Sequence, residues 1–277
     1  MKKPKITLIG YGRLGSYLAA ELIRKKAGLK YIVSHNVKDS GLFRKKLTKP
    51  VLTDSDVIII CVQDKNISET ASQIAKLKVP LKGKIIFHTS GLKSSSALEK
   101  LDGAYTGSFH PAQAFPSGTK NKKLFEGIYI ALEGSSKFIT FAKNLVKMMN
   151  AKSFIIRCDQ KIIYHLLCVF ASNYVLAYFA LLNKLATEAS LPGNWFEIIH
   201  PLLEKTLKDA GGYSCKSLTG PITRFDTDTL KEHLNAIKED KLISGLYKVL
   251  GNAASEISFQ NGDITKHQLQ KLKRILE

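Results

Sequence analysis

The pattern of apolar residues in the first part of the chain predicts strands alternating with helices. Up to about residue 157, short apolar runs are separated by longer amphipathic stretches. Runs such as Val57–Val62 are apolar throughout, which is typical of strands covered on both faces. The predicted strands are Ile6–Ile9, Tyr31–Ser34, Val57–Val62, Lys84–His88, Ala104–His110, Gly127–Leu132 and Ser153–Arg157, and the predicted helices are Leu14–Lys26, Ile67–Leu77, Ser94–Leu101 and Lys137–Met149.

After residue 157 the pattern predicts helices only. They are expected at Ile162–Ser190, Asn194–Lys208, Leu230–Lys238, Lys241–Phe259 and Thr265–Leu276, with Thr229 and Glu232 forming a capping box for the third. Alternating strands and helices indicate a parallel sheet with helices on both faces. We therefore predict an α/β Rossmann domain with a mostly parallel, doubly wound sheet at residues 1–157, followed by an all-α domain at residues 158–277.

A glycine-rich turn follows the first predicted strand. Gly10, Gly12 and Gly15 form a GxGxxG motif that opens the first predicted helix, the context in which this motif binds dinucleotides. Gly10 permits the tight turn, Gly12 leaves room for a pyrophosphate, and Gly15 allows close helix–strand packing. The exposed N–H groups and the helix dipole would bind the phosphates.

The end of the second predicted strand indicates which dinucleotide binds. An Asp or Glu there would bind the ribose 2′-hydroxyl of NAD, but no acid follows the end of this strand before Asp39. Ser34 and Asn36 can donate hydrogen bonds to a 2′-phosphate, and Lys38 and Arg13 can add positive charge. We therefore expect NADP(H). The expected cofactor residues are Gly10, Tyr11, Gly12, Arg13, Leu14, Gly15, Ser34, His35, Asn36, Val62, Gln63, Thr89 and Ser90.

Composition and charge narrow the class of protein further. Apolar residues make up 44% of the 277 residues and charged residues 23%, as in globular proteins. The net charge of +19 comes mostly from Lys residues spread along the chain, so a solvated surface is favoured over a nucleic-acid interface. The four Cys residues are far apart with no CxxC pair, which favours a reduced, cytoplasmic protein. No metal-ligand spacing and no nucleophile elbow is present in the sequence.

One apolar segment has the length of a membrane span. Ile162–Leu182 is long enough to cross a bilayer, but it contains His165, Ser172 and Asn173. No second hydrophobic segment of similar length and no signal peptide is evident. We therefore expect a helix buried between other helices, which would also suit the core of a homodimer.

Three sequence segments, Ser108–Pro116, Ala171–Tyr174 and Leu218–Asp226, carry a resemblance to a known family. The chain resembles bacterial Rossmann-like proteins labelled NADP oxidoreductases, which have no settled function. Its N-terminal half also resembles the cofactor domain of pyrroline-5-carboxylate reductases, ketopantoate reductases and β-hydroxyacid dehydrogenases, which join this domain to a helical domain like that of phosphogluconate dehydrogenase. The resemblance implies this fold and NADP(H) binding. It implies no substrate.

The carboxyl ends of the predicted strands hold the first candidates for chemistry. Val62 and Gln63 follow one strand, and Asp64 there is interpreted as a turn or helix N-cap. Thr89 and Ser90 follow the next, where they could approach a nicotinamide or simply cap a helix. His110 ends a further strand before Pro111 and could donate a proton to a developing alkoxide or amine, or be a structural loop histidine. Gln113, in the same loop, is a candidate substrate contact.

The long helix carries a polar stripe. At about 100° per residue, Lys161, His165, Cys168, Ser172 and Asn183 fall within a sector of roughly 60°, with Asn173 on its flank. In the related dehydrogenases the corresponding helix supplies a Lys and an Asn to the substrate, but at shorter spacing than Lys161 and Asn173. We therefore take His165, Ser172 and Asn173, with His110, as candidate catalytic residues. The alternative is a stripe satisfied by neighbouring helices or a dimer partner.

A third candidate cluster lies in the helical part. Arg224 could bind a substrate carboxylate bidentately, with Thr219 beside it, or could pair with Asp226 while Asp226 caps a helix. Together the candidates predict an NADP(H)-dependent oxidoreductase that reduces a small carbonyl or imine, with a carboxylate such as a 2-oxo acid as the expected substrate. The alternative is a catalytically inactive NADP(H)-sensing or regulatory protein. We expect neither nucleic acid nor a membrane as a partner.

Overall fold

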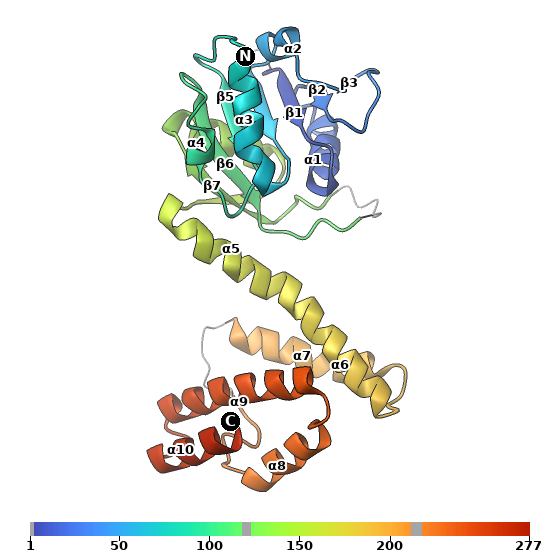
Figure 1. Cartoon of the computed structure of the whole chain (residues 1–277), viewed down its shortest axis with the longest axis vertical. Coiled ribbons are helices and arrows are strands. Elements are labelled where there is room, and N and C mark those ends of the chain that lie inside the picture. The colour runs from blue at the N-terminus through green and yellow to red at the C-terminus, as the bar shows by residue number, and fades with distance from the viewer. Residues whose placement is uncertain (1–2, 118–122, 212–217) are drawn as a thin grey trace. The chain divides into compact units, whose positions relative to one another are not determined.

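The computed structural model describes residues 3–117, 123–211 and 218–277, and the chain forms two compact units (Figure 1). The Rossmann unit comprises residues 1–175 and the helical unit residues 176–277. The contacts thus divide the chain later than the change of sequence pattern at residue 157. The reason is that the start of the long helix packs on the Rossmann unit, where the Lys161 side chain is fully buried.

The Rossmann unit is built on one eight-stranded sheet with the order β3-β2-β1-β4-β5-β6-β7-β8. Neighbouring strands are parallel except β6 and β7, so the mostly parallel, Rossmann-like sheet predicted from the sequence is confirmed. The strands are β1 (Ile6–Ile9), β2 (Leu29–Val33), β3 (Phe43–Arg44), β4 (Val57–Ile60), β5 (Ile85–His88), β6 (Tyr105–Pro111), β7 (Tyr129–Gly134) and β8 (Lys152–Ile155).

Helices cover both faces of this sheet. Leu18 and Leu22 of α1 (Arg13–Arg24) and Phe138 of α4 (Ser136–Met148) pack on one face. Ile67 of α3 (Ile67–Lys76) and Leu52 of α2 (Lys49–Thr53) pack on the other. Each strand supplies both faces because successive side chains alternate, so in β4 residues 57 and 59 join the first cluster and residues 58 and 60 the second.

Two short elements were not predicted from the apolar pattern of the sequence, and one predicted helix is wrong. Strand β3 has two residues and helix α2 has five, too few to show a period. The segment expected to be a helix at Ser94–Leu101 is a single 3₁₀ turn, η2 (Ser95–Leu98). Three serines open this segment, and serine favours caps and turns over helix interiors.

The long apolar helix consists of α5 (Lys161–Val169), a π-helical turn η4 (Phe170–Tyr174) and α6 (Val175–Glu188). The segment 158–188 has a mean hydropathy of 1.7 in its most apolar window and is long and apolar enough to cross a membrane by length and composition alone. None of that window is buried, so the expectation of a helix buried between other helices within the chain is wrong. The exposed apolar side chains of this helix are Ile162, Ile163, Leu166, Leu167, Phe170, Tyr174, Val175, Leu176 and Tyr178.

The helical unit also contains α7 (Trp195–Ala210), α8 (Thr227–Ala236), α9 (Lys241–Asn261) and α10 (Lys266–Ile275). Leu230, Ile264, Leu269 and Leu272 form its buried core. The expected capping box of Thr229 and Glu232 is wrong, because α8 begins earlier and Asp226 caps it by accepting from the backbone N–H of Thr229 at 3.1 Å. A residue that can accept two bonds from Thr229 is the better cap.

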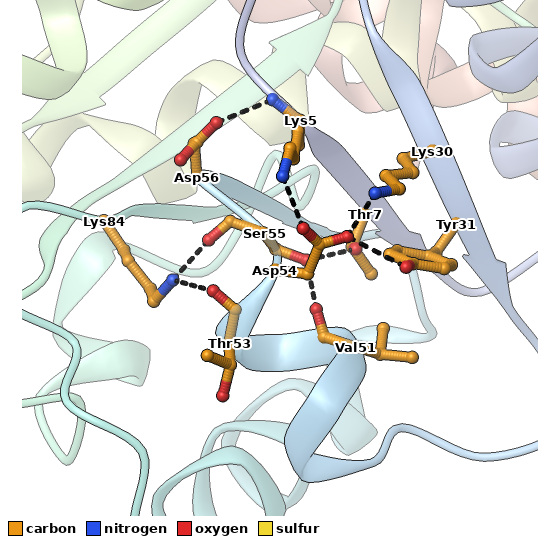
Figure 2. A network of polar contacts seen from close by, with 10 residues as sticks. All are labelled: Lys5, Thr7, Lys30, Tyr31, Val51, Thr53, Asp54, Ser55, Asp56 and Lys84. Carbon is orange, nitrogen blue, oxygen red and sulfur yellow. Dashed lines mark hydrogen bonds and ion pairs between the residues drawn. The ribbon is translucent and has the colours of Figure 1, made fainter.

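A cluster of charged residues joins the amino ends of four parallel strands (Figure 2). We call it the Asp54 cluster. Lys5 Nζ lies 2.5 Å from Asp54 Oδ1, Tyr31 donates to Oδ2 at 2.9 Å, and Lys30 pairs with the same oxygen. Hydrogen bonds from Lys30, Lys5 and Tyr31 hold the pKa of the Asp54 carboxyl well below its usual range. Lys84 extends the cluster by donating to the backbone oxygens of Thr53 and Ser55.

Candidate functional site

The turn between β1 and α1 requires glycine at two of its three positions. Gly10 has a φ of +101°, and a Cβ there would lie 2.2 Å from the carbonyl oxygen of Cys61. A Cβ on Gly15 would lie 2.3 Å from the carbonyl oxygen of Gly10. The first turn of α1 therefore packs directly on the ends of β1 and β4, closer than any larger residue would permit.

Gly12 is in the opposite situation. Nothing lies within 4 Å of a Cβ placed on it, and no side chain caps α1 at this position. The first N–H groups of α1 consequently have no side-chain acceptor, which is the arrangement that binds a phosphate at a helix N-terminus. The open space at Gly12 and the uncapped helix start fit the pyrophosphate of a dinucleotide.

A cavity of about 270 Å³ opens beside this turn at the carboxyl ends of the strands. We call it the histidine cavity. It brings together many of the residues expected from the sequence, together with Cys61, Asp64, Gly91, Pro111 and Phe115. The expected residues are Gly12, Arg13, Leu14, Gly15, Val62, Thr89, Ser90, His110, Gln113 and His165.

A second cavity, of about 500 Å³, lies at the ends of β1 and β2. We call it the Ser34 cavity. Among the residues expected to bind the cofactor, it contains Gly10, Ser34, His35 and Val62. The remaining lining residues are Ile9, Val33, Lys46, Leu47, Asn66, Glu69, Thr70, Gln73, Lys76 and Leu77. The two cavities share Val62, so together they follow the glycine turn from the end of β2 to the end of β6.

His110 lies beyond the neighbouring strand because β6 is longer than β5. The last residue of β5, His88, pairs with Ser108, and β6 continues for three more residues. His110 Nδ1 lies 2.9 Å from the hydroxyl of Tyr164, and its ring is 6.0 Å from that of His165. A Cβ on Gly91 would lie 2.8 Å from His110 Nε2, so the glycine leaves both histidine rings room at the cavity wall.

The surroundings of His110 favour its neutral form. Burial, and then the positive charges of Lys161 and of His165 when it is protonated, lower the pKa of His110 to about 4. Burial raises the pKa of the Tyr164 hydroxyl, so this group keeps its proton. At neutral pH the pair is therefore an uncharged imidazole hydrogen-bonded to an uncharged phenol.

A buried network supports the floor of the histidine cavity. Lys161 has no exposed surface, and its Nζ donates to Ser108 Oγ at 2.8 Å and to the carbonyl oxygen of Ser90 at 3.2 Å. Ser108 Oγ donates to Glu133 at 3.3 Å. Glu133 also accepts from the backbone N–H of Ser95 at 2.7 Å and from its hydroxyl at 2.6 Å. Burial lowers the pKa of Lys161.

Ser90 and Asp64 hold the loop after β5 in place. Ser90 Oγ donates to Asp64 Oδ2 at 2.7 Å and accepts from the backbone N–H groups of Leu92 and Lys93. Of the two interpretations of Asp64, the turn is confirmed, since Asp64 opens the 3₁₀ turn η1 (Asp64–Asn66). The helix N-cap is wrong, because the Asp64 carboxylate binds the Ser90 hydroxyl and caps no helix. Beside this loop, burial raises the pKa of the Cys61 thiol to about 11, and Thr89 donates to its sulfur.

Several expected site residues line neither cavity. Tyr11 is 39% exposed and packs edge-on against Phe43, at 5.2 Å between ring centroids. Asn36 and Gln63 also lie outside both cavities, and Ser172 and Asn173 are in the π-helical turn η4.

The two other expected site residues, Thr219 and Arg224, belong to the helical unit. There Thr219 lines a largely apolar cavity of about 620 Å³, and Arg224 is exposed, its charge helping to lower the pKa of Asp226.

The structure adds residues that the sequence reasoning did not select. Tyr164, Glu133 and Lys46 are not among the sequence candidates, and Lys161 is among them only as part of the polar stripe. Glu133 carried a usable signal, because a carboxylate within an otherwise apolar strand needs a buried partner. The described residues contain no group of three or more His, Cys, Asp or Glu side chains that could hold a metal ion.

Two known family descriptions match parts of this chain. Residues 5–90 match the family described as NADP oxidoreductase, coenzyme F420-dependent, and residues 128–254 match a domain of unknown function, DUF2520. The first match makes residues 5–90 similar to an NADP-binding domain of that type. No curated protein sequence is similar enough to be matched to the chain.

Three solved structures illustrate the similarity in fold. A Bacteroides fragilis protein provisionally named an NADP oxidoreductase has 22% identity and a TM-score of 0.73, over 92% of this chain and 98% of its own. An imine reductase from Myxococcus stipitatus, in complex with NADP⁺, has 14% identity and a TM-score of 0.67, over 97% and 99%. A Plasmodium falciparum pyrroline carboxylate reductase with NADP bound has 16% identity and a TM-score of 0.57, over the full length of both chains. The chain therefore resembles NADP-dependent oxidoreductases, as its sequence motifs indicated.

Proposed function

We propose that this protein is an NADP(H)-dependent oxidoreductase that reduces a small carbonyl or imine compound carrying a carboxylate. The observation that carries the proposal is the histidine cavity, where the glycine turn of a dinucleotide site shares one wall with His110 and His165. A cofactor held along the glycine turn would have its reactive end beside these two histidines.

The residues present fit such a cofactor. The first N–H groups of α1 would bind its pyrophosphate, and the open space at Gly12 would receive it. Thr89 and Gly91 border the histidine cavity with little side-chain bulk, which suits a flat ring. NADPH, once bound, supplies the hydride, so the protein has to orient the substrate, hold a proton and exclude water.

His110 is the residue best placed to handle the proton. Its pKa of about 4 makes it neutral at pH 7, so it would act by donating a hydrogen bond from Nε2 to the substrate oxygen or nitrogen. Tyr164 supports this tautomer when its hydroxyl donates to Nδ1, which leaves Nε2 protonated. A neutral imidazole can polarise a carbonyl in this way without carrying charge.

The Ser34 cavity supports a preference for NADPH over NADH. Ser34 can donate to a 2′-phosphate, and Lys46, which the sequence reasoning did not select, adds a positive charge to the same cavity. The acidic residue of the lining, Glu69, accepts from Gln73 at 3.2 Å within its own helix. Asn36, expected to contribute, lies outside the cavity lining.

A carboxylate on the substrate would need a cationic partner. Arg13 lines the histidine cavity and is the first candidate. Arg224 of the helical unit stays a second candidate, as the sequence suggested, and its guanidinium is exposed. A panel of 2-oxo acids and cyclic imines, each with its uncharged analogue, would separate recognition of the carboxylate from recognition of the reacting bond.

A titration of the purified protein with NADPH and with NADH tests the proposal first. We expect tight binding of NADPH and weaker binding of NADH, measured by energy transfer to the nicotinamide. The Gly12→Ala variant should keep its fold, since its Cβ has open space, but should lose at least about tenfold in NADPH affinity because the methyl group occupies the pyrophosphate position. Gly193→Ala, also in open space but in the helical unit, is the matched control.

Each outcome is decisive for one part of the proposal. Wild-type protein that binds neither nucleotide would refute the cofactor site. Equal binding by wild type and Gly12→Ala would refute the role given to the turn. Tight NADPH binding without turnover across the whole substrate panel would favour an NADP(H)-sensing protein over an enzyme.

We also propose that a second copy of the chain covers the exposed apolar side chains of α5 and α6. The exposed residues include Leu166, Leu167 and Phe170, a density that water-exposed helices avoid. A bilayer is a poorer environment for this helix because Lys161, His165 and Asn173 lie within it. Light scattering at micromolar concentration should give the mass of a dimer, and a monomer would refute this proposal.

A further inference from the structure

Lys161 is the only lysine among the buried side chains of the described residues, and it has no exposed surface. It is the first residue of α5, so its side chain reaches from the start of the long helix into the sheet. An ammonium group that is fully removed from water is costly unless it is hydrogen-bonded. The bonds that it makes therefore indicate what it is for.

Those bonds connect three separate segments. The carbonyl oxygen of Ser90 belongs to the loop after β5, Ser108 belongs to β6, and Lys161 itself belongs to α5. These segments supply Ser90, Gly91, His110 and His165 to the wall of the histidine cavity. Lys161 thus joins the loop, the strand and the helix that form this wall.

The negative charge that balances Lys161 is held at a distance. Glu133 is reached only through Ser108, and no ion pair joins Lys161 to a carboxylate in the part of the chain that the structure describes. Glu133 is itself occupied by two bonds from Ser95. The carboxylates of Glu133 and Asp64 act on Lys161 without an ion pair, and the positive charge of Lys161 in turn acts on His110.

His110 is the neighbour that matters for chemistry. From α5, Tyr164 is hydrogen-bonded to it, His165 lies beside it, and Lys161 acts on it through its charge, while Asp64 and Arg13 line the same cavity. Asp64 is bound to the Ser90 hydroxyl, and Tyr164 is uncharged. Burial is the larger cause that disfavours the cationic form of His110, and the charge of Lys161 adds to it.

We propose that Lys161 is a positioning residue: its ammonium group fixes the Ser90 loop against β6 and α5, and its positive charge adds to the burial that disfavours a protonated His110. The second part rests on the proposed function, in which neutral His110 donates the hydrogen bond to the substrate. Lys161 does not touch the substrate, because its Nζ is enclosed and already donates to Ser90 and Ser108.

Two variants separate the hydrogen bonds of Lys161 from its charge. Lys161→Gln removes the charge and keeps a donor, whereas Lys161→Met removes both. Lys137→Met, an exposed position on α4, is the control for loss of a positive charge elsewhere. For each protein we would measure the titration of His110 by NMR with labelled histidine, assigned by comparison with His110→Asn, and the NADPH dissociation constant.

Both Lys161 variants should raise the midpoint of the His110 titration by about half a unit or more, while the control leaves it unchanged. Lys161→Met should weaken NADPH binding at least about tenfold because the Ser90 loop loses its anchor, and Lys161→Gln should retain most of the affinity. In an active enzyme the acid limb of the pH–rate profile should move with the His110 midpoint.

An unchanged His110 midpoint in a folded Lys161 variant would overturn the charge part of the proposal. Equal NADPH affinity in Lys161→Met and wild type would overturn the anchoring part. If Lys161→Met does not fold, the double variant Lys161→Met/Glu133→Gln, which removes both buried charges together with the donor, carries the same measurements. Wild-type protein that fails to bind NADPH would refute the proposed function, whereas the NMR titration decides the effect of Lys161 on His110 independently.

Discussion

The two ends of the sheet in the Rossmann unit use the same types of residue in different ways. At the amino ends, Lys5 and Lys30 contact Asp54 directly, and all three side chains are partly exposed. At the carboxyl ends, Lys161 and Glu133 are both buried, and Ser108 stands between them. The first arrangement brings opposite charges into direct contact, and the second leaves a positive charge acting on His110.

This difference separates stabilisation from chemistry. Direct ion pairs at an exposed edge hold strands together, and water and salt screen them, so they affect little beyond their own contact. A buried charge without a direct partner costs more desolvation free energy, and its electrostatic effect extends further than that of an exposed ion pair. Such a charge is useful where a nearby group must keep one protonation state. We therefore assign a stabilising role to the charges at the amino ends of the strands and a functional role to the charges at the carboxyl ends.

The largest effect on activity is expected from His110→Asn. With a substrate from the panel, kcat should fall by about 100-fold or more, because the hydrogen bond from Nε2 is lost. NADPH affinity should change much less, since the glycine turn is untouched. Unchanged turnover in this variant would contradict the role of His110 as hydrogen-bond donor to the substrate and would favour His165 instead.

The same variant tests the pH dependence of stability. The folded-state pKa of His110, about 4, lies below its ordinary value of 6.5, so between these values only the unfolded chain takes up the proton. Wild-type stability should therefore fall as the pH falls from about 6.5 to about 4, and His110→Asn should show a shallower fall in denaturant titrations. His88, whose pKa burial also lowers, accounts for part of the remaining slope.

A smaller loss is expected from Gly91→Ala. Its Cβ would lie 2.7 Å from the His165 ring and 2.8 Å from His110 Nε2, so both rings must shift. We expect turnover to fall by about 10- to 100-fold with little loss of thermal stability, since the rings can move into the cavity. Gly193→Ala, which meets nothing within 4 Å, should match wild type in both measurements.

The smallest effect is expected at the other end of the sheet, from Asp54→Asn. The melting temperature should fall by a few degrees at pH 7, while NADPH affinity and turnover stay at wild-type values. Because its pKa is lowered in the folded state, Asp54 stabilises the fold above its ordinary pKa of 3.8, and this contribution is lost as the pH falls further.

The difference between Asp54→Asn and wild type should also shrink at 1 M salt, and Asp102→Asn, at an exposed position, is the control. A variant that lost NADPH binding here would contradict the separation of the two ends.

The sequence predicted the sheet well because its signals are local. Strands β1, β4 and β5 are short apolar runs, and each lies within one residue or two of its predicted bounds. The glycine turn was equally readable, since the close contacts at Gly10 and Gly15 tolerate no other residue. Such local patterns do not predict which cavity each expected cofactor residue lines.

The contacts of the site were harder to predict because they join distant residues. Lys161 and Ser108 are 53 positions apart, and His110 and Tyr164 are 54 apart, so no spacing rule connects them. Tyr164 was read as part of an apolar helix, although its hydroxyl makes the key contact. The cap of α8 was misplaced for a simpler reason, because Thr229 and Asp226 both suit a helix start and only the fold selects one.

The buried thiol of Cys61 makes the occupancy of the histidine cavity measurable by chemical modification. Its sulfur lines the histidine cavity and its pKa is raised to about 11, so at neutral pH it stays protonated and reacts slowly with alkylating reagents. Cys158, by contrast, is exposed. A ligand that fills the histidine cavity will therefore be seen as a slowing of the rate at which an alkylating reagent modifies Cys61.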